Sequence, residues 1–259
     1  MIPLPAPLAI VGAMEQELRA VLALINDARR VGAAGREFWV GRLHGHEVVA
    51  VLSRIGKVAA ATTATALIER FGVRALLFTG VAGGLASGVR VGDFIVADAF
   101  LQHDMDASPL FPRYEVPLYG KARFATDRAL ADRLADAAKR VARDAPRLLG
   151  EAALREFAID APRVHQGLVI SGDRFVASSA ESHALRSALP EALAVEMEGA
   201  ALAQVCHDYG LPFAALRVVS DRADDAAHGD FMRFMDQVAS RCTAAVLARL
   251  LGAEGALPV

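Results

Sequence analysis

Residues 212–225, PFAALRVVSDRADD, decide how this chain folds. The stretch begins as an apolar, β-branched run and ends abruptly in Ser220, Asp221 and Arg222, which is typical of a buried strand that delivers polar side chains to its carboxyl end. In open α/β sheets, ligands bind at the carboxyl ends of strands. Asp221 is therefore predicted to lie in a cleft as a general acid. The alternative is that it caps the next helix.

The composition is that of a globular protein with a large core. The chain has 259 residues, of which 54% are hydrophobic and 22% are charged. Its formal net charge of −2 gives no electrostatic reason to expect a nucleic acid or an anionic membrane as partner. Its two cysteines, Cys206 and Cys242, do not form a C-x-x-C pair, which argues against a disulfide framework and a structural zinc site.

The first residues, MIPLPAPLAIVGAM, lack a basic segment and contain three prolines, so they make a poor signal peptide. No apolar run reaches the roughly 20 residues that span a bilayer. We therefore expect a soluble, cytoplasmic protein, in which residues 1–7 form an N-terminal tail.

Apolar runs alternate with helical patterns along the chain. Continuous apolar strands between helices predict a parallel-type sheet that is covered on both faces. One pair of runs reads as a hairpin that turns at His44-Gly45-His46. We expect strands at 8–14, 37–44, 47–54, 74–84, 91–103, 166–170 and 193–198, and helices at 15–27, 56–71, 127–145, from 199 onward and at 229–251.

The sequence contains no internal repeat, low-complexity segment or linker, so one domain over residues 1–259 is expected. Residues 146–162 are the least regular segment and predict a surface insertion. Residues 108–117, SPLFPRYEVP, form a proline-rich loop that carries Phe111 and Tyr114. Such aromatic residues suit a partner surface, a pocket lid or local packing.

Four glutamates lie where predicted strands meet helices. Glu15 and Glu17 open a helix, where the helix dipole favours them, but a carboxylate at this edge can also orient a water molecule. Both carboxylates would repel a phosphate there. Glu196 and Glu198 end the run LAVEME and lie on one face only if the strand continues. One of them would be satisfied by vicinal sugar hydroxyls, and the alternative is a helix-start glutamate.

Glycines and an aromatic residue indicate further contacts with a ligand. The glycines of TGVAGG (79–84) allow close approach of the backbone but do not form G-x-G-x-x-G, so a dinucleotide site is not supported. Asp173 caps or braces its loop, and Phe175 either belongs to the core or stacks on a flat heterocycle. The neighbours His103–Asp106 point in different directions, so we expect no metal site.

Several of these motifs together resemble one family, the 5′-methylthioadenosine/S-adenosylhomocysteine nucleosidases of the nucleoside phosphorylase superfamily. The similarity extends from residue 8 to residue 251, apart from 146–162. VEMEGAA followed by RVVSD is specific, and GAMEQE narrows the resemblance from phosphorylases to hydrolases. The motifs are VGAMEQE (11–17), IGKVAA (55–60), TGVAGG (79–84), VGD (91–93), SGDRF (171–175), VEMEGAA (195–201) and RVVSD (217–221).

The resemblance implies a three-layer α/β/α fold with a mixed central sheet, a homodimer, and no metal or cofactor. It implies hydrolysis of the N-glycosidic bond of 5′-substituted adenine nucleosides, which releases adenine and a 5-substituted ribose. In relatives, the loop after His103 often covers the 5′ substituent in the partner subunit, so we expect residues 105–117 near the interface.

The resemblance also implies roles for single residues. Glu17 matches the glutamate that activates water, Asp221 the general acid at purine N7, and Glu198 the residue that binds the ribose hydroxyls. The remaining contacts that it implies are Met197 at the sugar, Phe175 stacked on adenine, the Val176 backbone at the base edge, and Arg217, Ser220, Ile55, Val81, Ala82 and Gly83 around the substrate. Val81 stands where many relatives have a serine near the water.

Three other functions fit parts of this pattern. A phosphate-dependent purine nucleoside phosphorylase needs an anion site; Arg54 and Arg217 favour it, whereas Glu15 and Glu17 oppose it. An aminodeoxyfutalosine nucleosidase would use the same residues, which leaves the preferred 5′ substituent open. A non-catalytic nucleoside sensor would bind adenosine without releasing adenine, and three site carboxylates argue against it.

Overall fold

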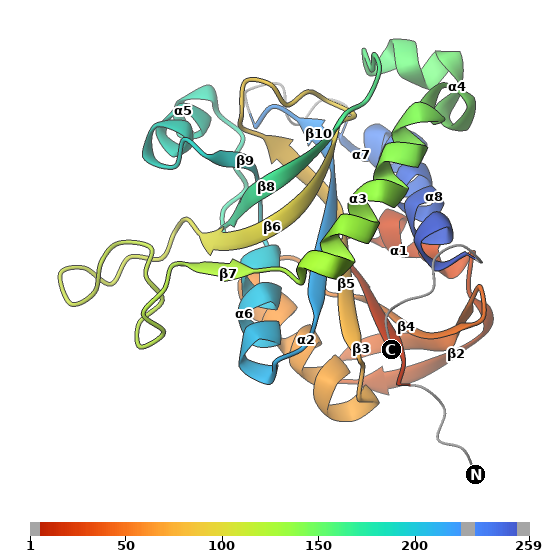
Figure 1. Ribbon diagram of the computed structural model, residues 1–259, viewed down its shortest axis with the longest axis horizontal. Coiled ribbons are helices and arrows are strands. Elements are labelled where there is room, and N and C mark those ends of the chain that lie inside the picture. The colour runs from red at the N-terminus through yellow and green to blue at the C-terminus, as the bar shows by residue number, and fades with distance from the viewer. Residues whose placement is uncertain (1–5, 224–230, 253–259) are drawn as a thin grey trace.

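The computed structural model describes residues 6–223 and 231–252, in which a mixed sheet carries helices on both faces (Figure 1). The predicted three-layer α/β/α fold is thereby confirmed. The strands are β1 (Leu8–Gly12), β2 (Asn26–Ala33), β3 (Arg36–Leu43), β4 (His46–Leu52), β5 (Ala75–Gly84), β6 (Phe94–Gln102), β7 (Arg123–Ala125), β8 (Val164–Ser171), β9 (Ala192–Glu196) and β10 (Phe213–Asp221). The helices are α1 (Glu15–Leu22), α2 (Lys57–Phe71), α3 (Arg128–Arg143), α4 (Ala145–Glu156), α5 (Ser179–Ala188), α6 (Gly199–Tyr209), α7 (Phe231–Phe234), the π-helix η1 (Met235–Ala239) and α8 (Ser240–Leu251).

The sheet follows the order β10-β6-β8-β9-β5-β1-β4-β3-β2, and β10 also pairs with β5. Strand β5 is the branch point, because it pairs in parallel with β1 and β10, while its last two residues pair antiparallel with β9. Gly83 is the register partner of both Asp221 and Val195. This branching brings the carboxyl ends of β5, β9 and β10 to one place.

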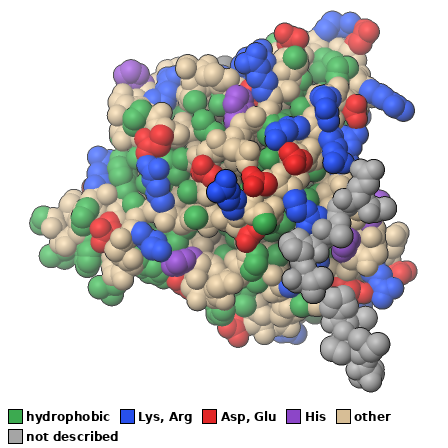
Figure 2. Space-filling view, viewed as in Figure 1, with side chains coloured by type: hydrophobic (Ala, Val, Ile, Leu, Met, Phe, Trp, Pro, Cys, Tyr) green, Lys and Arg blue, Asp and Glu red, His purple; other side chains and the backbone are tan. Residues whose placement is uncertain are grey.

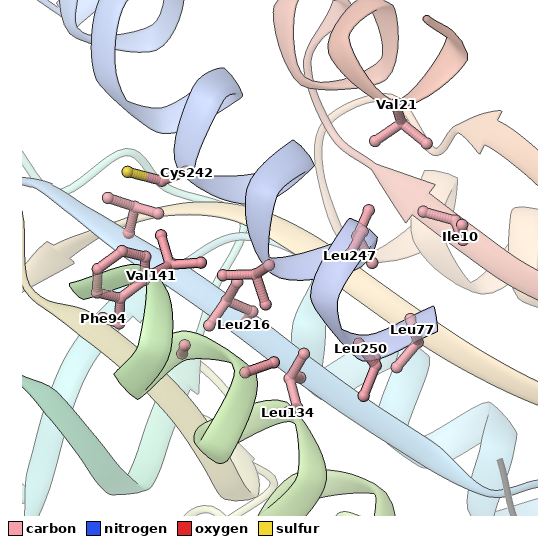
Figure 3. Close-up of a cluster of buried hydrophobic side chains, with 14 of the residues drawn as sticks. Ile10, Val21, Leu77, Phe94, Leu134, Val141, Leu216, Cys242, Leu247 and Leu250 are labelled. Carbon is pink, nitrogen blue, oxygen red and sulfur yellow. The ribbon is translucent and has the colours of Figure 1, made fainter. Parts of the chain in front are cut away.

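Alternate residues of the central strands pack into two hydrophobic cores, one on each face of the sheet. In β1, Leu8 and Ile10 belong to the cluster that includes α1, α3 and α8, whereas Ala9 and Val11 belong to the cluster that includes α2 and α6. Figure 3 shows the first cluster, in which side chains of β10, α3 and α8 converge. Because both faces of the central strands are buried, strands such as β1 and β10 form continuous apolar runs in the sequence.

Strand β2 was not predicted. The sequence indicates a helix to about residue 27, but α1 ends at Leu22 and β2 follows as the outer strand of the sheet, paired with β3. Its residues are mostly exposed, so they show no apolar alternation. A side chain at Gly41 of β3 would lie 2.5 Å from Ile25 and 2.6 Å from the Asn26 carbonyl oxygen, so this glycine allows the close approach.

The expectation of an irregular segment at 146–162 was wrong, because residues 145–156 form α4. Pro146 lies in the first turn, where its missing N–H costs no helical hydrogen bond. Leu149 and Ala153 are buried in the cluster that includes α3 and α8. Gly150, with φ of 80°, breaks the helix in the middle and weakens its sequence pattern.

The hairpin at His44-Gly45 forms as predicted, with both residues in the left-handed region (φ of 48° and 86°), as a two-residue turn requires. The last helix begins at Phe231 in the described chain. The predicted start at Gly229 and the end of the first quoted stretch, Asp224 and Asp225, lie outside the described residues.

Residues 103–122 form a long excursion between β6 and β7 that projects from the body of the molecule (Figure 1). Hydrophobic side chains gather on this projection in the space-filling view (Figure 2), and Leu110 and Leu118 are 85% and 91% exposed. Within 6–223 and 231–252, no helix combines the length and the apolar character needed to cross a membrane.

Candidate active site

One pocket lies where the carboxyl ends of β1, β5, β9 and β10 meet. All twelve residues that the sequence analysis selected line it. They are Glu17, Ile55, Val81, Ala82, Gly83, Phe175, Val176, Met197, Glu198, Arg217, Ser220 and Asp221. The pocket therefore joins segments that are up to about two hundred residues apart in the sequence.

The sequence analysis missed several residues that line the same pocket. Phe231 is one of them, and its ring meets that of Phe175 edge-on, with centroids 6.4 Å apart. No signal near Phe231 in the sequence marks it, because a tertiary contact brings α7 to the pocket. The lining residues without a predicted role are Ala13, Met14, Arg174, Val195 and Phe231, whereas Gly80 and Glu196 were candidates that the sequence left undecided.

Glu17 is held by the turn between β1 and α1. Its Oε2 accepts hydrogen bonds from the backbone N–H groups of Ala13 (2.9 Å) and Met14 (3.0 Å). Its Oε1 is buried and has no hydrogen-bond partner among the described residues. Burial raises the pKa of Glu17 to about 7, although the charge of Arg217 and the backbone N–H groups of Met14, Ala13 and Val81 act in the opposite direction. One oxygen is thus fixed, and the other remains available to a ligand or water.

Gly80 leaves the space in which Glu17 and Arg217 approach one another. A Cβ atom at this position would lie 2.8 Å from Glu17 Oε1 and 2.9 Å from Arg217 Nη1. This is a physical reason for a glycine in TGVAGG that does not involve a phosphate.

Arg217 and Glu196 form a buried ion pair, Nη2 to Oε2 at 2.9 Å. The guanidinium carbon also lies 3.6 Å from the centre of the Phe78 ring. Glu196 further accepts hydrogen bonds from the backbone N–H groups of Glu198 (3.1 Å) and Gly199 (2.9 Å). Glu196 thus fixes both the arginine and the start of α6.

Glu198 lies two residues beyond the end of β9 and directly before α6, and its side chain diverges from that of Glu196. Its Oε1 accepts a hydrogen bond from the Gly56 N–H at 2.8 Å, whereas Glu196 is bonded to Arg217. The question that the sequence left open is thereby answered, since the two carboxylates do not point the same way. Burial, followed by the charge of Glu196, raises the pKa of Glu198.

Asp221 ends β10 beside Gly83. Its Oδ1 accepts a hydrogen bond from the Ala223 N–H at 2.7 Å, and its Oδ2 accepts one from the Ser220 hydroxyl at 2.6 Å. A Cβ atom at Gly83 would lie 3.0 Å from Asp221 Oδ1. The local turn therefore aims this carboxyl group into the pocket.

An aromatic and aliphatic wall completes the pocket. Phe175 is 43% exposed and Ile55 is 57% exposed, which is unusual for residues of their kind, while Val176 is buried. A wall with an open phenyl face suits a flat heterocycle, and nearby carboxylates suit hydroxyl and N–H donors. Among the described residues no group of three or more histidine, cysteine, aspartate or glutamate side chains is arranged to hold a metal ion.

The fold and this site define a class of nucleoside-binding enzyme. The sequence pattern of the phosphorylase superfamily matches residues 7–251, and the chain belongs to this superfamily. Within this superfamily, the chain belongs to the 5′-methylthioadenosine/S-adenosylhomocysteine nucleosidase family, because solved nucleosidases are more than 30% identical to it over almost its whole length.

The nucleosidase of Neisseria meningitidis, solved with methylthio-immucillin-A, is 36% identical with a TM-score of 0.81, over 95% of this chain and 98% of that one. The nucleosidase of Streptococcus pneumoniae, solved with a transition-state inhibitor, is 33% identical with a TM-score of 0.81, over 96% and 99%. The futalosine hydrolase of Helicobacter pylori is 31% identical with a TM-score of 0.79, over 94% and 97%.

Proposed function

We propose that this protein hydrolyses the N-glycosidic bond of 5′-substituted adenine nucleosides, such as 5′-methylthioadenosine and S-adenosylhomocysteine, and releases adenine and a 5-substituted ribose. One observation carries the proposal: Glu17, with a raised pKa and one available oxygen, shares a pocket with Asp221 and Glu198. These are the groups that glycoside cleavage needs, namely a base for water, an acid for the leaving group and a grip on the sugar.

The reaction follows from the charge that develops when the bond between ribose C1′ and adenine N9 breaks. The electron pair leaves with the base, and the sugar becomes oxocarbenium-like. Asp221 donates a proton to purine N7, so adenine departs neutral. Oε1 of Glu17 accepts a proton from the water that attacks C1′. Val81 lines the pocket without a hydroxyl group, so the water depends on Glu17 for its orientation.

Glu198 and Phe175 position the two halves of the substrate. With Oε1 held by Gly56, Glu198 accepts hydrogen bonds from the ribose hydroxyls, and Met197 lines the sugar. Phe175 stacks on adenine, and the Val176 backbone binds its edge. Arg217 pairs with the carboxylate of Glu196, and the Ser220 hydroxyl donates a hydrogen bond to Asp221. Ala82, Gly83 and Ile55 form part of the pocket wall. General acid–base help of this kind is typically worth about 10²–10⁴-fold in rate.

A second substrate deserves a test because one similar structure is a futalosine hydrolase. The same base and sugar contacts would serve aminodeoxyfutalosine, which differs in its 5′ substituent.

The projecting, apolar excursion at 105–117 supports a homodimer in which each subunit helps cover the other's substrate. A cytoplasmic location fits this reaction.

The test is incubation with 5′-methylthioadenosine, S-adenosylhomocysteine, 5′-deoxyadenosine and aminodeoxyfutalosine, each with and without phosphate. We expect release of the free base at a rate that does not depend on phosphate. A requirement for phosphate would assign the protein to the phosphorylases instead, and tight binding without release would assign it to the sensors.

A further inference from the structure

Three residues outside the pocket lining form a closed ring of hydrogen bonds. The backbone N–H of Lys57 donates to Asp173 Oδ1 at 2.7 Å, and the backbone N–H of Asp173 donates to Asp104 Oδ2 at 2.9 Å. The ammonium group of Lys57 closes the ring by donating to Asp104 Oδ1 at 2.6 Å. The ring connects the start of α2, the end of β6 and the loop after β8, which are distant in sequence.

Lys57 is the most enclosed member of this ring. Its side chain is 16% exposed, against 33% for Asp104, and its ammonium group also donates to Gln102 Oε1 at 3.0 Å. Burial favours the neutral form of Asp104, but the hydrogen bonds from Lys57 and Asp173 outweigh it and lower the pKa of Asp104. This charge-assisted contact, in which Lys57 is largely buried and Asp104 is partly exposed, holds its geometry better than an ion pair between two fully exposed side chains.

The ring reaches the pocket on two sides. Gly56, directly before Lys57, donates its N–H to Glu198 Oε1 at 2.8 Å. Gly56 has φ of 95° and offers no side chain to cap α2, so Asp173 caps this helix from a distant part of the chain. Phe175 lies two residues beyond Asp173 in the same loop. The ring therefore determines where both Gly56 and the loop 171–176 stand.

We propose that Lys57, Asp104 and Asp173 are positioning residues, which hold Gly56 and the loop 171–176 so that Glu198 and Phe175 engage a ribonucleoside together. The proposal rests on the proposed function for the identity of the ligand. It also gives a role to Asp104 and Asp173, which the catalytic residues leave unexplained.

The test compares Lys57→Met with the matched control Lys139→Met. Lys139 pairs with Asp136 at 3.0 Å on the exposed face of α3, with side chains 54% and 66% exposed. For Lys57→Met we expect the KM for 5′-methylthioadenosine to rise at least about fivefold, while kcat changes less than about threefold, because the charge-assisted contact is lost but Glu17 and Asp221 are untouched. The preference for this substrate over its 2′-deoxy analogue should fall, because Glu198 loses its support. Lys139→Met should match the wild type.

A second readout does not depend on activity. Hydrogen exchange at the amides of Gly56, Lys57 and Asp173 should accelerate in Lys57→Met and in Asp104→Asn, and Lys57→Arg should restore part of the protection. If Lys57→Met does not fold, Asp104→Asn replaces it in both assays. Unchanged KM, unchanged ribose preference or unchanged exchange at these amides would overturn the proposal. If wild-type protein hydrolyses no nucleoside, the proposed function fails, while the exchange experiment still decides whether the ring holds both segments.

Discussion

Arg217 and Glu196 form an ion pair in the interior of the protein, with side chains that are 1% and 4% exposed. Both members of the pair act on the neighbouring carboxyl groups: the charge of Arg217 lowers the pKa of Glu17, and the charge of Glu196 raises the pKa of Glu198. Because Glu196 already neutralises Arg217, the arginine compensates Glu17 only in part, and burial dominates the pKa of Glu17. A base with a pKa of about 7 suits proton transfer near neutral pH.

Glu196→Gln should move the acidic limb of the pH profile of kcat/KM to lower pH, by about one unit. Without its partner, Arg217 stabilises the ionised form of Glu17 more strongly, and loss of the Glu196 charge lowers the pKa of Glu198 in the same direction. Breaking a buried pair should also cost about 3–5 kcal/mol of unfolding free energy. The profile is measured by steady-state kinetics between pH 5 and 9. Reduced stability with an unmoved limb would show that Glu196 is structural alone.

Glu17→Gln should abolish most activity and yet stabilise the fold at alkaline pH. The folded-state pKa of about 7 exceeds the ordinary 4.5, so the folded wild type holds its proton while the unfolded chain loses it. The contribution of Glu17 to the wild-type free energy of unfolding therefore declines between pH 4.5 and 7 and then levels off. A glutamine at this position does not ionise, so the variant does not lose this stability. The difference in unfolding free energy is about 3 kcal/mol above pH 7 and close to zero below pH 4. Urea unfolding at pH 4 and pH 8 measures the difference, and an equal effect at both values would contradict the assignment.

Gly80→Ala should impair both activity and stability. The new methyl group would lie within 3 Å of Glu17 Oε1 and Arg217 Nη1, so one of these charged side chains must move. Overpacking of this kind costs about 1–3 kcal/mol. Gly88→Ala is the matched control, since no atom lies within 4 Å of its added Cβ. We expect a loss of kcat/KM of at least about tenfold for Gly80→Ala, and equal effects of both substitutions would contradict this account.

The sequence predicted those parts of the structure that have a local signal. Buried strands such as β10 reveal themselves by apolar runs, and polar residues at their ends, such as Asp221, indicate the pocket. Strand β2 was not predicted because an exposed outer strand needs no apolar alternation. Helix α4 was not predicted because Gly150 interrupts its helical pattern.

Local sequence patterns also could not predict the residues whose role depends on tertiary contacts. Phe231 lines the pocket only because α7 packs there, and the ion pair of Glu196 with Arg217 joins residues of two strands that are 21 positions apart. The ring through Lys57, Asp104 and Asp173 connects three segments that no pattern links. The assignment of the chain to a single domain over residues 1–259, with an insertion at 146–162, stays a prediction.

The most direct test of the central claim is adenine release from 5′-methylthioadenosine by Asp221→Asn, measured in a single turnover beside nucleoside binding by calorimetry. Asparagine keeps the shape of the side chain but has no acidic proton to give to purine N7. We predict that hydrolysis falls by at least about 10²-fold while the dissociation constant stays within about fivefold of the wild type. Release at the wild-type rate by a variant that binds normally would contradict the claim that Asp221 is the acid.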